Sequence, residues 1–314
     1  MVATYSFESA LKLAAKVNWQ VEDIIGGDQQ LNFAQRFLPE TLANVSGIHC
    51  LNDAEKLKLN QIRGNSYLHL FGLVEEFIVP TVIGHLKTNG LTDITAAQAL
   101  LHFAEEESKH IRLFRQFAKA FERGFGSRCE CIGPAHEIAA AIAQHSPLGV
   151  MLIILYIEWM TQYHYLESVR NNSFESLDAQ FCSLLRHHWL EEAQHTGLDT
   201  LMLEQLAQTL SPTEIETGIE DFFKIVAFLN GGLMAQAQLD IASLERATER
   251  TFTEAEKAEI QAIQQPSYQW AFIGSGITHR NFVQVFNTIG PSSQARLAEV
   301  SQQYQVISFN EYLP

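Results

Sequence analysis

The sequence predicts an all-α fold, a four-helix bundle with additional N- and C-terminal helices. Apolar residues recur at three- and four-residue steps over long stretches, which is typical of helices that bury one face. Few stretches alternate apolar and polar residues as half-buried strands do. Apolar residues make up 46% of the 314 residues, which is enough for a substantial core.

The first half of the chain predicts four helices. Glycine and proline residues between 124 and 134 mark a loop after the third of them. Polar residues at the starts of the second and third helices can cap free backbone N–H groups. The expected helices are 5–24, 53–86 (capped by Asn52 or Asp53), 92–123 (capped by Thr92 or Asp93) and 135–145.

The second half predicts three further long helices and a set of shorter ones. Serine followed by proline opens two of the long helices, because serine caps and proline suits the first turn. The expected helices are 147–171 (opened by Ser146-Pro147), 176–209, 211–249 (opened by Ser211-Pro212) and shorter ones over 254–303, around Pro266 and Pro291.

These elements predict one helical domain over residues 1–314. The bundle is expected at about 53–209, with the helices at about 211–303 packed on it. An extended tail is expected over the last ten residues, 305–314.

Charge and hydropathy argue against several classes of partner. The chain carries 21 Lys and Arg against 36 Asp and Glu, a net charge of −15, which repels nucleic-acid phosphates and anionic membranes. The longest apolar run, Leu148–Ile157, is too short to span a bilayer, which needs about 20 residues. The N-terminus lacks the basic and apolar regions of a signal peptide. We therefore expect a cytoplasmic protein that binds neither nucleic acid nor a membrane.

Two E-x-x-H motifs, Glu107–His110 and Glu192–His195, stand on predicted helices. Residues i and i+3 share a helical face, so each pair can bind one metal ion through an oxygen and a nitrogen. Roughly one such motif is expected by chance in a chain of this composition, so the motif indicates a metal site only if the surrounding residues support one. Both motifs interrupt apolar stripes that face a core, where an unpaired carboxylate is costly. We therefore predict that they share a buried metal site.

Two further carboxylate positions stand in apolar helices. Glu158 lies in a segment that is apolar almost all round. Glu75-Glu76 lies in LHLFGLVEEFIVPTV, with no other charge nearby. Each of these two shares a helical face with apolar neighbours, so the choice between them stays open, with a slight preference for Glu76.

The order of these residues predicts a two-metal site. Glu76, Glu107, Glu158 and Glu192 are separated by 31, 51 and 34 residues, which suits mid-helix positions on neighbouring antiparallel helices. A Glu from each of two helices and a Glu-x-x-His from each of the other two is the pattern of ferritin-like di-metal carboxylate proteins.

Over about residues 53–205 the chain resembles the ferritin-like di-iron oxidase and oxygenase superfamily. His188 precedes Glu192 and His195 on the same helical face, as His-x-x-x-Glu-x-x-His. In this the chain resembles the p-aminobenzoate N-oxygenase family of arylamine oxygenases, which adds a third histidine ligand on the last bundle helix. The resemblance implies two iron ions, with manganese possible. The implied ligands are Glu76 (or Glu75), Glu107, His110, Glu158, His188, Glu192 and His195.

The resemblance implies an oxidoreductase that uses O2 to oxidise a small organic substrate, for example an arylamine, with electrons from an external donor. Three alternatives stay open: a desaturase or hydroxylase of an acyl chain, a ferroxidase or metal-binding protein without an organic substrate, and a helical interaction protein without metal. Asp199, one turn beyond His195, is expected to hydrogen-bond a ligand histidine. Exposed bundle faces are compatible with a homodimer.

Overall fold

The computed structural model describes residues 5–26, 30–89, 91–173 and 175–304, and these residues form helices and loops without a β-strand. The prediction of an all-α fold is confirmed. The tail expected at 305–314 lies outside the described residues.

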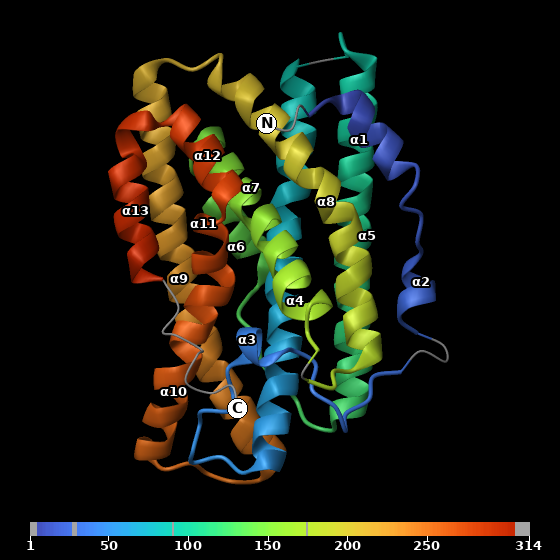
Figure 1. Ribbon diagram of the computed structural model, residues 1–314, viewed down its shortest axis with the longest axis vertical. Coiled ribbons are helices and arrows are strands. Elements are labelled where there is room, and N and C mark those ends of the chain that lie inside the picture. The colour runs from blue at the N-terminus through green and yellow to red at the C-terminus, as the bar shows by residue number, and fades with distance from the viewer. Residues whose placement is uncertain (1–4, 27–29, 90, 174, 305–314) are drawn as a thin grey trace.

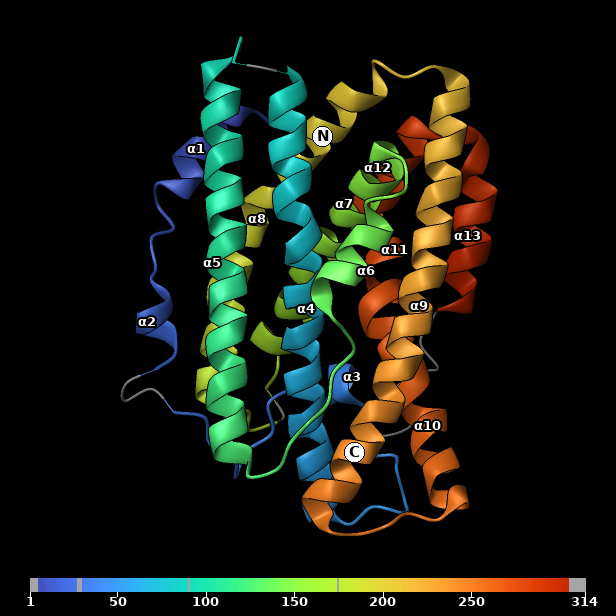
Figure 2. The ribbon, with the colours of Figure 1, turned by 180° about the vertical axis from the view of Figure 1, so that it is seen from behind.

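Four long helices form the bundle, and Figure 1 shows their arrangement. α4 packs against α5 and α7 packs against α8, and Figure 2 shows the α4–α5 pair from behind. The chain passes directly from α7 into a π-helix, η1. The bundle helices are Asp53–Asn89 (α4), Ile94–Phe125 (α5), Pro147–Tyr163 (α7), continued by His164–Arg170 (η1), and Ala179–Ala207 (α8). Their ends lie within three residues of those predicted.

Polar side chains fix where the bundle helices begin. Asp93 and Ser146 each accept a hydrogen bond from a backbone N–H in the first turn of α5 and α7. Asp178 caps α8 in the same way. Its second oxygen accepts the backbone N–H of Asn32 at 2.9 Å, so this cap also attaches the N-terminal segment to the bundle.

The N-terminal segment does not form the single helix predicted for 5–24. It forms α1 (Phe7–Ala14) and α2 (Val21–Ile24), which lie along the outer side of α5 and α8 (Figures 1 and 2). The chain leaves the helix between them because Trp19 turns inward. Its ring stacks on that of His110, with centroids 6.1 Å apart and planes 9° from parallel. Burial of this large ring offsets the stability lost with the missing helical turn.

The remaining helices cover the other side of the bundle. α9 packs on α4 and α7, and α10 packs on α9. A cluster of buried apolar side chains continues from the bundle into these helices. Pro266 lies inside α10 instead of at a break. The bounds are Glu40–Ala43 (α3), Ala135–Ile142 (α6), Pro212–Thr248 (α9), Glu254–Gln269 (α10), Trp270–Gly274 (η2), Ser275–Ile277 (α11), Arg280–Ile289 (α12), Pro291–Ser293 (η3) and Gln294–Gln303 (α13).

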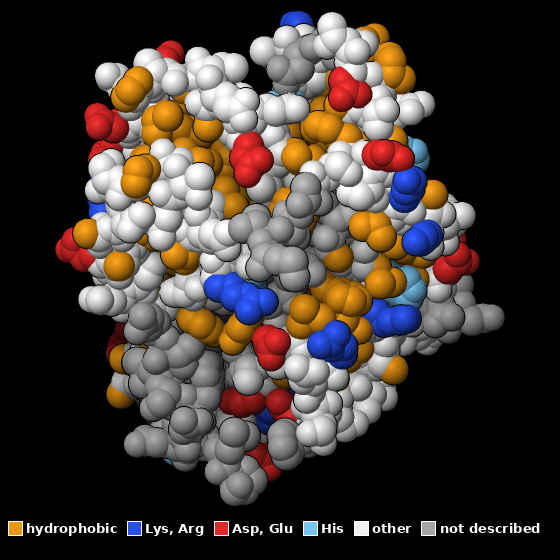
Figure 3. Space-filling view, turned by 45° about the horizontal axis from the view of Figure 1, so that its top comes forward, with side chains coloured by type: hydrophobic (Ala, Val, Ile, Leu, Met, Phe, Trp, Pro, Cys, Tyr) orange, Lys and Arg blue, Asp and Glu red, His pale blue; other side chains and the backbone are white. Residues whose placement is uncertain are grey.

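Two helices are long and apolar enough to cross a membrane, judged by length and composition alone. They are α4 over Asp53–Thr88 and α9 over Pro212–Thr248. Both pack within the helical body, and core helices meet the same criterion, so this is weak evidence. On the face seen in Figure 3, acidic, basic and apolar side chains are interspersed. The absence of a membrane partner stays a prediction.

Candidate metal centre

Seven carboxylate and imidazole side chains converge inside the bundle. Each of them is at most 2% exposed. All four bundle helices contribute, and α8 contributes three of the seven. They are Glu75, Glu107, His110, Glu158, His188, Glu192 and His195.

Glu75, and not Glu76, belongs to this cluster, so the slight preference for Glu76 is corrected. Glu75 Oε1 lies 3.5 Å from His188 Nε2 and 3.9 Å from His110 Nδ1. The Glu76 side chain is 26% exposed and accepts from Arg115 at 3.1 Å. Consecutive residues of an α-helix point about 100° apart, so only one of the two glutamates can face the cluster.

The ligand atoms form two groups, and within each group they lie within 4.8 Å of one another. We call the place where Glu75, His110 and His188 meet the α4-side position. The place where Glu158 and His195 meet is the α7-side position. Each position thus has one glutamate of its own. The α4-side position has two histidines, whereas the α7-side position has one.

The two remaining glutamates face both positions. Glu107 Oε1 lies 2.8 Å from His195 Nδ1, and its Oε2 lies 3.4 Å from His110 Nδ1. Glu192 Oε1 lies 3.1 Å from His110 Nδ1, and its Oε2 lies 3.3 Å from His195 Nδ1. Glu192 Oε1 also lies 2.8 Å from His188 Nε2. A carboxylate with one oxygen toward each position can bridge two metal ions.

Six of these buried atoms make no hydrogen bond of suitable geometry within the described part of the chain, although His195 Nδ1 lies 2.8 Å from Glu107 Oε1 and His188 Nε2 lies 2.8 Å from Glu192 Oε1. Buried polar atoms are seldom left unpaired, because their desolvation then goes uncompensated. Two divalent cations would satisfy them, and their four positive charges equal the four carboxylates. Oxygen and imidazole donors suit iron or manganese. The unpaired atoms are Glu75 Oε2, Glu107 Oε1, Glu158 Oε2, His188 Nε2, Glu192 Oε1 and His195 Nδ1.

Electrostatics within the centre favour protonation of one carboxylate and ionisation of another. Burial, together with repulsion from Glu192, raises the pKa of Glu158 well above its usual range. Burial opposes the charged form of Glu192, but attraction to His188 and the hydrogen bond from Glu158 hold its pKa well below the usual range. Without metal, Glu158 therefore keeps a proton that it donates to Glu192, and a metal ion would displace that proton.

Each motif histidine is oriented by a carboxylate from the opposite helix. His110 Nε2 on α5 donates to Glu191 on α8 at 2.9 Å. His195 Nε2 on α8 donates to Glu106 on α5 at 2.9 Å. These bonds hold one proton on Nε2 of each ring. Burial disfavours the charged rings, but the surrounding carboxylates raise the pKa of both histidines well above the usual range, so a metal ion at Nδ1 would displace a second proton. The sequence reasoning missed both carboxylates. Each directly precedes the motif glutamate of its own helix, so the doubled glutamate in E-E-x-x-H was the available signal.

The two orienting carboxylates have different neighbours. Glu106 accepts from the neutral amide of Gln194 at 2.8 and 2.7 Å. Glu191 pairs with the ammonium of Lys109. That ammonium lies 4.2 Å from the centroid of the Trp19 ring, so the N-terminal segment covers this pair.

Asp199 does not bind His195 as predicted, because Glu106 already accepts the Nε2 proton of that ring. Asp199 is buried near the α7-side position, and its Oδ2 has no hydrogen-bond partner among the described residues. Burial raises its pKa well above the usual range, although attraction to His195 opposes the shift. A cation bound at the α7-side position would favour the ionised form of Asp199, so its effect on a loaded centre would be one of charge.

Phenylalanine rings enclose the centre. The Phe103 ring lies 4.2 Å from that of His195, centroid to centroid. Phe114 and Phe71 lie 5.1 and 5.5 Å from the His188 ring. Such a shell keeps water away from the ligand atoms and strengthens electrostatic interactions among them.

Comparisons with known proteins place few constraints on this chain. No protein-family model matches the sequence, and no curated protein matches it. Two solved structures cover 93% of this chain and 94% of their own, at a TM-score of 0.39. Both are variants of an R2-like ligand-binding oxidase with a reconstituted Mn/Fe cofactor, 13% and 14% identical to this chain. This similarity is too low to support statements about chemistry, which rest on the centre itself.

Proposed function

We propose that this chain is an oxidoreductase that activates O2 at two metal ions and oxidises a small organic substrate. The ions are iron, with manganese possible. One observation carries the proposal: seven buried ligands from four helices leave unpaired atoms facing two adjoining positions. A merely structural polar cluster would have fewer carboxylate oxygens converging on two points, and its buried atoms would be oriented to hydrogen-bond one another or backbone groups.

Two of the seven residues would bind both ions, and the other five would each bind one. Glu107 and Glu192 would bind both ions, because each turns one oxygen to each position. The remaining five ligands would complete the two shells. When bound in reduced form, two iron ions supply electrons and a site at which O2 reacts. The phenylalanine shell excludes water from the reacting atoms.

The third histidine supports a reaction like that of arylamine N-oxygenases. His188 Nε2 lies within 3.5 Å of both Glu75 and Glu192 and has no hydrogen-bond partner in the described chain. Burial lowers its pKa, although attraction to Glu192 opposes the shift, and this favours the neutral ring that a metal ligand must be. N-oxygenation of an arylamine remains the finer part of the proposal, as do an external electron donor, a cytoplasmic location and a homodimer.

A second candidate is oxidation of an acyl chain. A cavity of about 190 Å³, lined almost entirely by apolar side chains, lies between α4, α7 and α9. Phe71 and Ile157 line it, and Phe71 also contacts the His188 ring. An alkyl chain in this cavity would lie one aromatic ring away from the α4-side position.

Metal analysis and oxygen consumption test the proposal together. Protein produced with ample iron and manganese should contain about two transition-metal ions per chain. After reduction it should consume O2 without added Fe(II). Protein without bound transition metal would sink the proposal. Protein that consumes O2 only while oxidising added Fe(II) would be a ferroxidase, and the organic substrate would have to be given up.

A further inference from the structure

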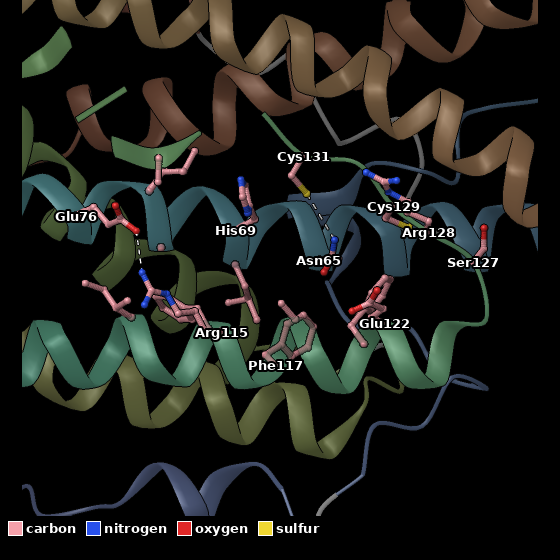
Figure 4. A pocket seen from close by; sticks show the side chains of 18 residues that line it. Asn65, His69, Glu76, Arg115, Phe117, Glu122, Ser127, Arg128, Cys129 and Cys131 are labelled. Atoms are coloured by element: carbon pink, nitrogen blue, oxygen red, sulfur yellow. Dashed lines mark hydrogen bonds and ion pairs between the residues drawn. The ribbon is translucent and has the colours of Figure 1, made fainter. Parts of the chain in front are cut away.

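A cavity of about 450 Å³ lies between α4, α5 and the loop after α5 (Figure 4). Its volume falls in the range of small-molecule sites. None of the seven proposed metal ligands is among the described residues that line it. The cavity is therefore separate from the centre, and its relation to the centre depends on the wall between them.

Phe114 forms that wall. It lines the cavity, and the centroid of its ring lies 5.1 Å from that of His188 and 6.5 Å from that of His110. A molecule that lies on the cavity side of this ring is one side chain away from the α4-side position. No comparable contact links the cavity to the α7-side position among the described rings.

A glycine on α4 keeps the space beside Phe114 open. Gly72 lines the cavity, and a Cβ placed there would lie 3.7 Å from Phe114 Cβ. This is an ordinary contact, so the backbone does not require glycine here. A long side chain at position 72 would occupy the cavity beside the Phe114 ring. Position 72 therefore sets how much room a molecule has next to this wall.

The lining combines aromatic rings with balanced charge. Phe114, Phe117 and Phe121 line the α5 side of the cavity. The charged lining residues are two arginines and two glutamates, which cancel: Arg115 pairs with Glu76 at 3.1 Å, as Figure 4 shows. The other two, Glu122 and Arg128, have no ion pair within the described residues, and Asn65 and Ser127 add neutral hydrogen-bonding groups.

We propose that this cavity is the substrate pocket of the metal centre and that it takes an uncharged aromatic molecule with one polar group. The aromatic lining favours a flat ring beside Phe114. The lining charges sum to zero, so a carboxylate drawn to Arg128 or an ammonium drawn to Glu122 also meets a like charge on the same cavity. The substrate role rests on the function proposed above, whereas binding in the cavity does not.

Three probes of one shape test the charge preference. They are 2-naphthol, 2-naphthoate and 2-naphthylmethylamine, titrated into the metal-free and the metal-loaded protein and followed by ligand fluorescence. We expect 2-naphthol to bind to both forms and each charged probe to bind at least about fivefold more weakly. Equal or tighter binding of the anion or the cation would overturn the proposal.

Two filling variants locate the bound probe. Gly72→Leu and Ala118→Phe should each weaken 2-naphthol binding at least about tenfold, because both positions line the cavity. Gly84→Leu on the same helix faces open space, and Lys119→Phe is an exposed neighbour outside the lining. These two controls should bind as the parent does. Since Ala118 is exposed on α5, its variant keeps the test valid if Gly72→Leu fails to fold. Unchanged binding in a folded filling variant would refute the location.

A paramagnetic measurement links the cavity to the centre. In protein loaded with Mn(II), the protons of bound 2-naphthol should relax faster than in protein loaded with Zn(II). If 2-naphthol binds but its protons do not relax faster with Mn(II), the cavity is still a binding site but is not the substrate pocket of the metal centre. Metal loading without any 2-naphthol binding would remove the pocket and leave the proposed function standing. Binding of 2-naphthol by a protein that takes up no metal would leave the pocket standing and remove the proposed function.

Discussion

The α4-side and α7-side positions are built by the same E-E-x-x-H unit used twice, yet their surroundings differ. At the α4-side position a second histidine, His188, is present, and the orienting carboxylate Glu191 is neutralised by Lys109. At the α7-side position there is one histidine, Glu106 has the neutral amide of Gln194 as its partner besides His195, and the buried Asp199 adds a further carboxyl group. The repeated unit therefore makes the centre, and the residues around it make the two positions unequal.

This difference has a chemical consequence. The α7-side position gathers more negative charge around one ion, and the α4-side position gathers more neutral nitrogen. Anionic oxygen ligands favour harder and more highly charged ions, whereas imidazole suits Fe(II) and similar ions. The two positions should therefore differ in affinity, and changes at single residues should act on one position at a time.

The largest effect is expected where the two positions are joined. Glu192→Ala removes a carboxylate that faces both, so both ions should be lost, with metal content falling below about one tenth of the parent value. Metal analysis after gel filtration measures this. Glu105→Ala is the matched control, because Glu105 is an exposed glutamate beside the other motif. Retention of both ions in the Glu192 variant would show that this residue does not bridge.

Loss of the third histidine should affect only the α4-side position. His188→Ala should weaken one of the two ions about 100-fold or more and leave the other in place. Chelator competition monitored by metal analysis resolves the two affinities. His187→Ala is the control, since the His187 ring bonds to the Ser183 carbonyl and does not belong to the cluster. If both affinities matched the parent, His188 would not be a ligand.

The crossed carboxylates give a smaller effect with a distinctive pattern. Glu191→Gln should weaken the α4-side ion and Glu106→Gln the α7-side ion, each about 10- to 100-fold, because each orients the histidine of the opposite helix. The same chelator competition measures both. If each variant instead weakened the ion bound by its own motif, the crossed arrangement would be contradicted.

Asp199→Asn should have the smallest effect. Asp199 accepts no hydrogen bond from His195, so it acts on the α7-side ion through charge alone. Removing one charge at this range should change that affinity by about fivefold, roughly 1 kcal/mol. The α4-side affinity serves as the internal control and should not change. An effect as large as that of Glu106→Gln would mean that Asp199 becomes a ligand once metal is bound.

Helical periodicity and motif spacing predicted the bundle and five of its seven converging side chains, and the family resemblance added His188, but neither could choose between Glu75 and Glu76. α4 buries side chains on several faces, since it packs against α5, α7 and α9, so burial alone does not mark the face toward the centre. The helix break at Trp19 could not be predicted from the sequence either. It depends on a ring stack with His110 across 91 residues of sequence, which no local pattern reports.

The central claim is that one buried cluster holds two ions through shared glutamates. Anomalous scattering from crystals of metal-loaded protein, collected at the iron and manganese edges, tests it most directly. We predict two peaks inside the bundle, one bound by Glu75, His110 and His188 and the other by Glu158 and His195, with Glu107 and Glu192 reaching both. A loaded crystal with no peak there, or with a single peak that leaves one position empty, would contradict the account.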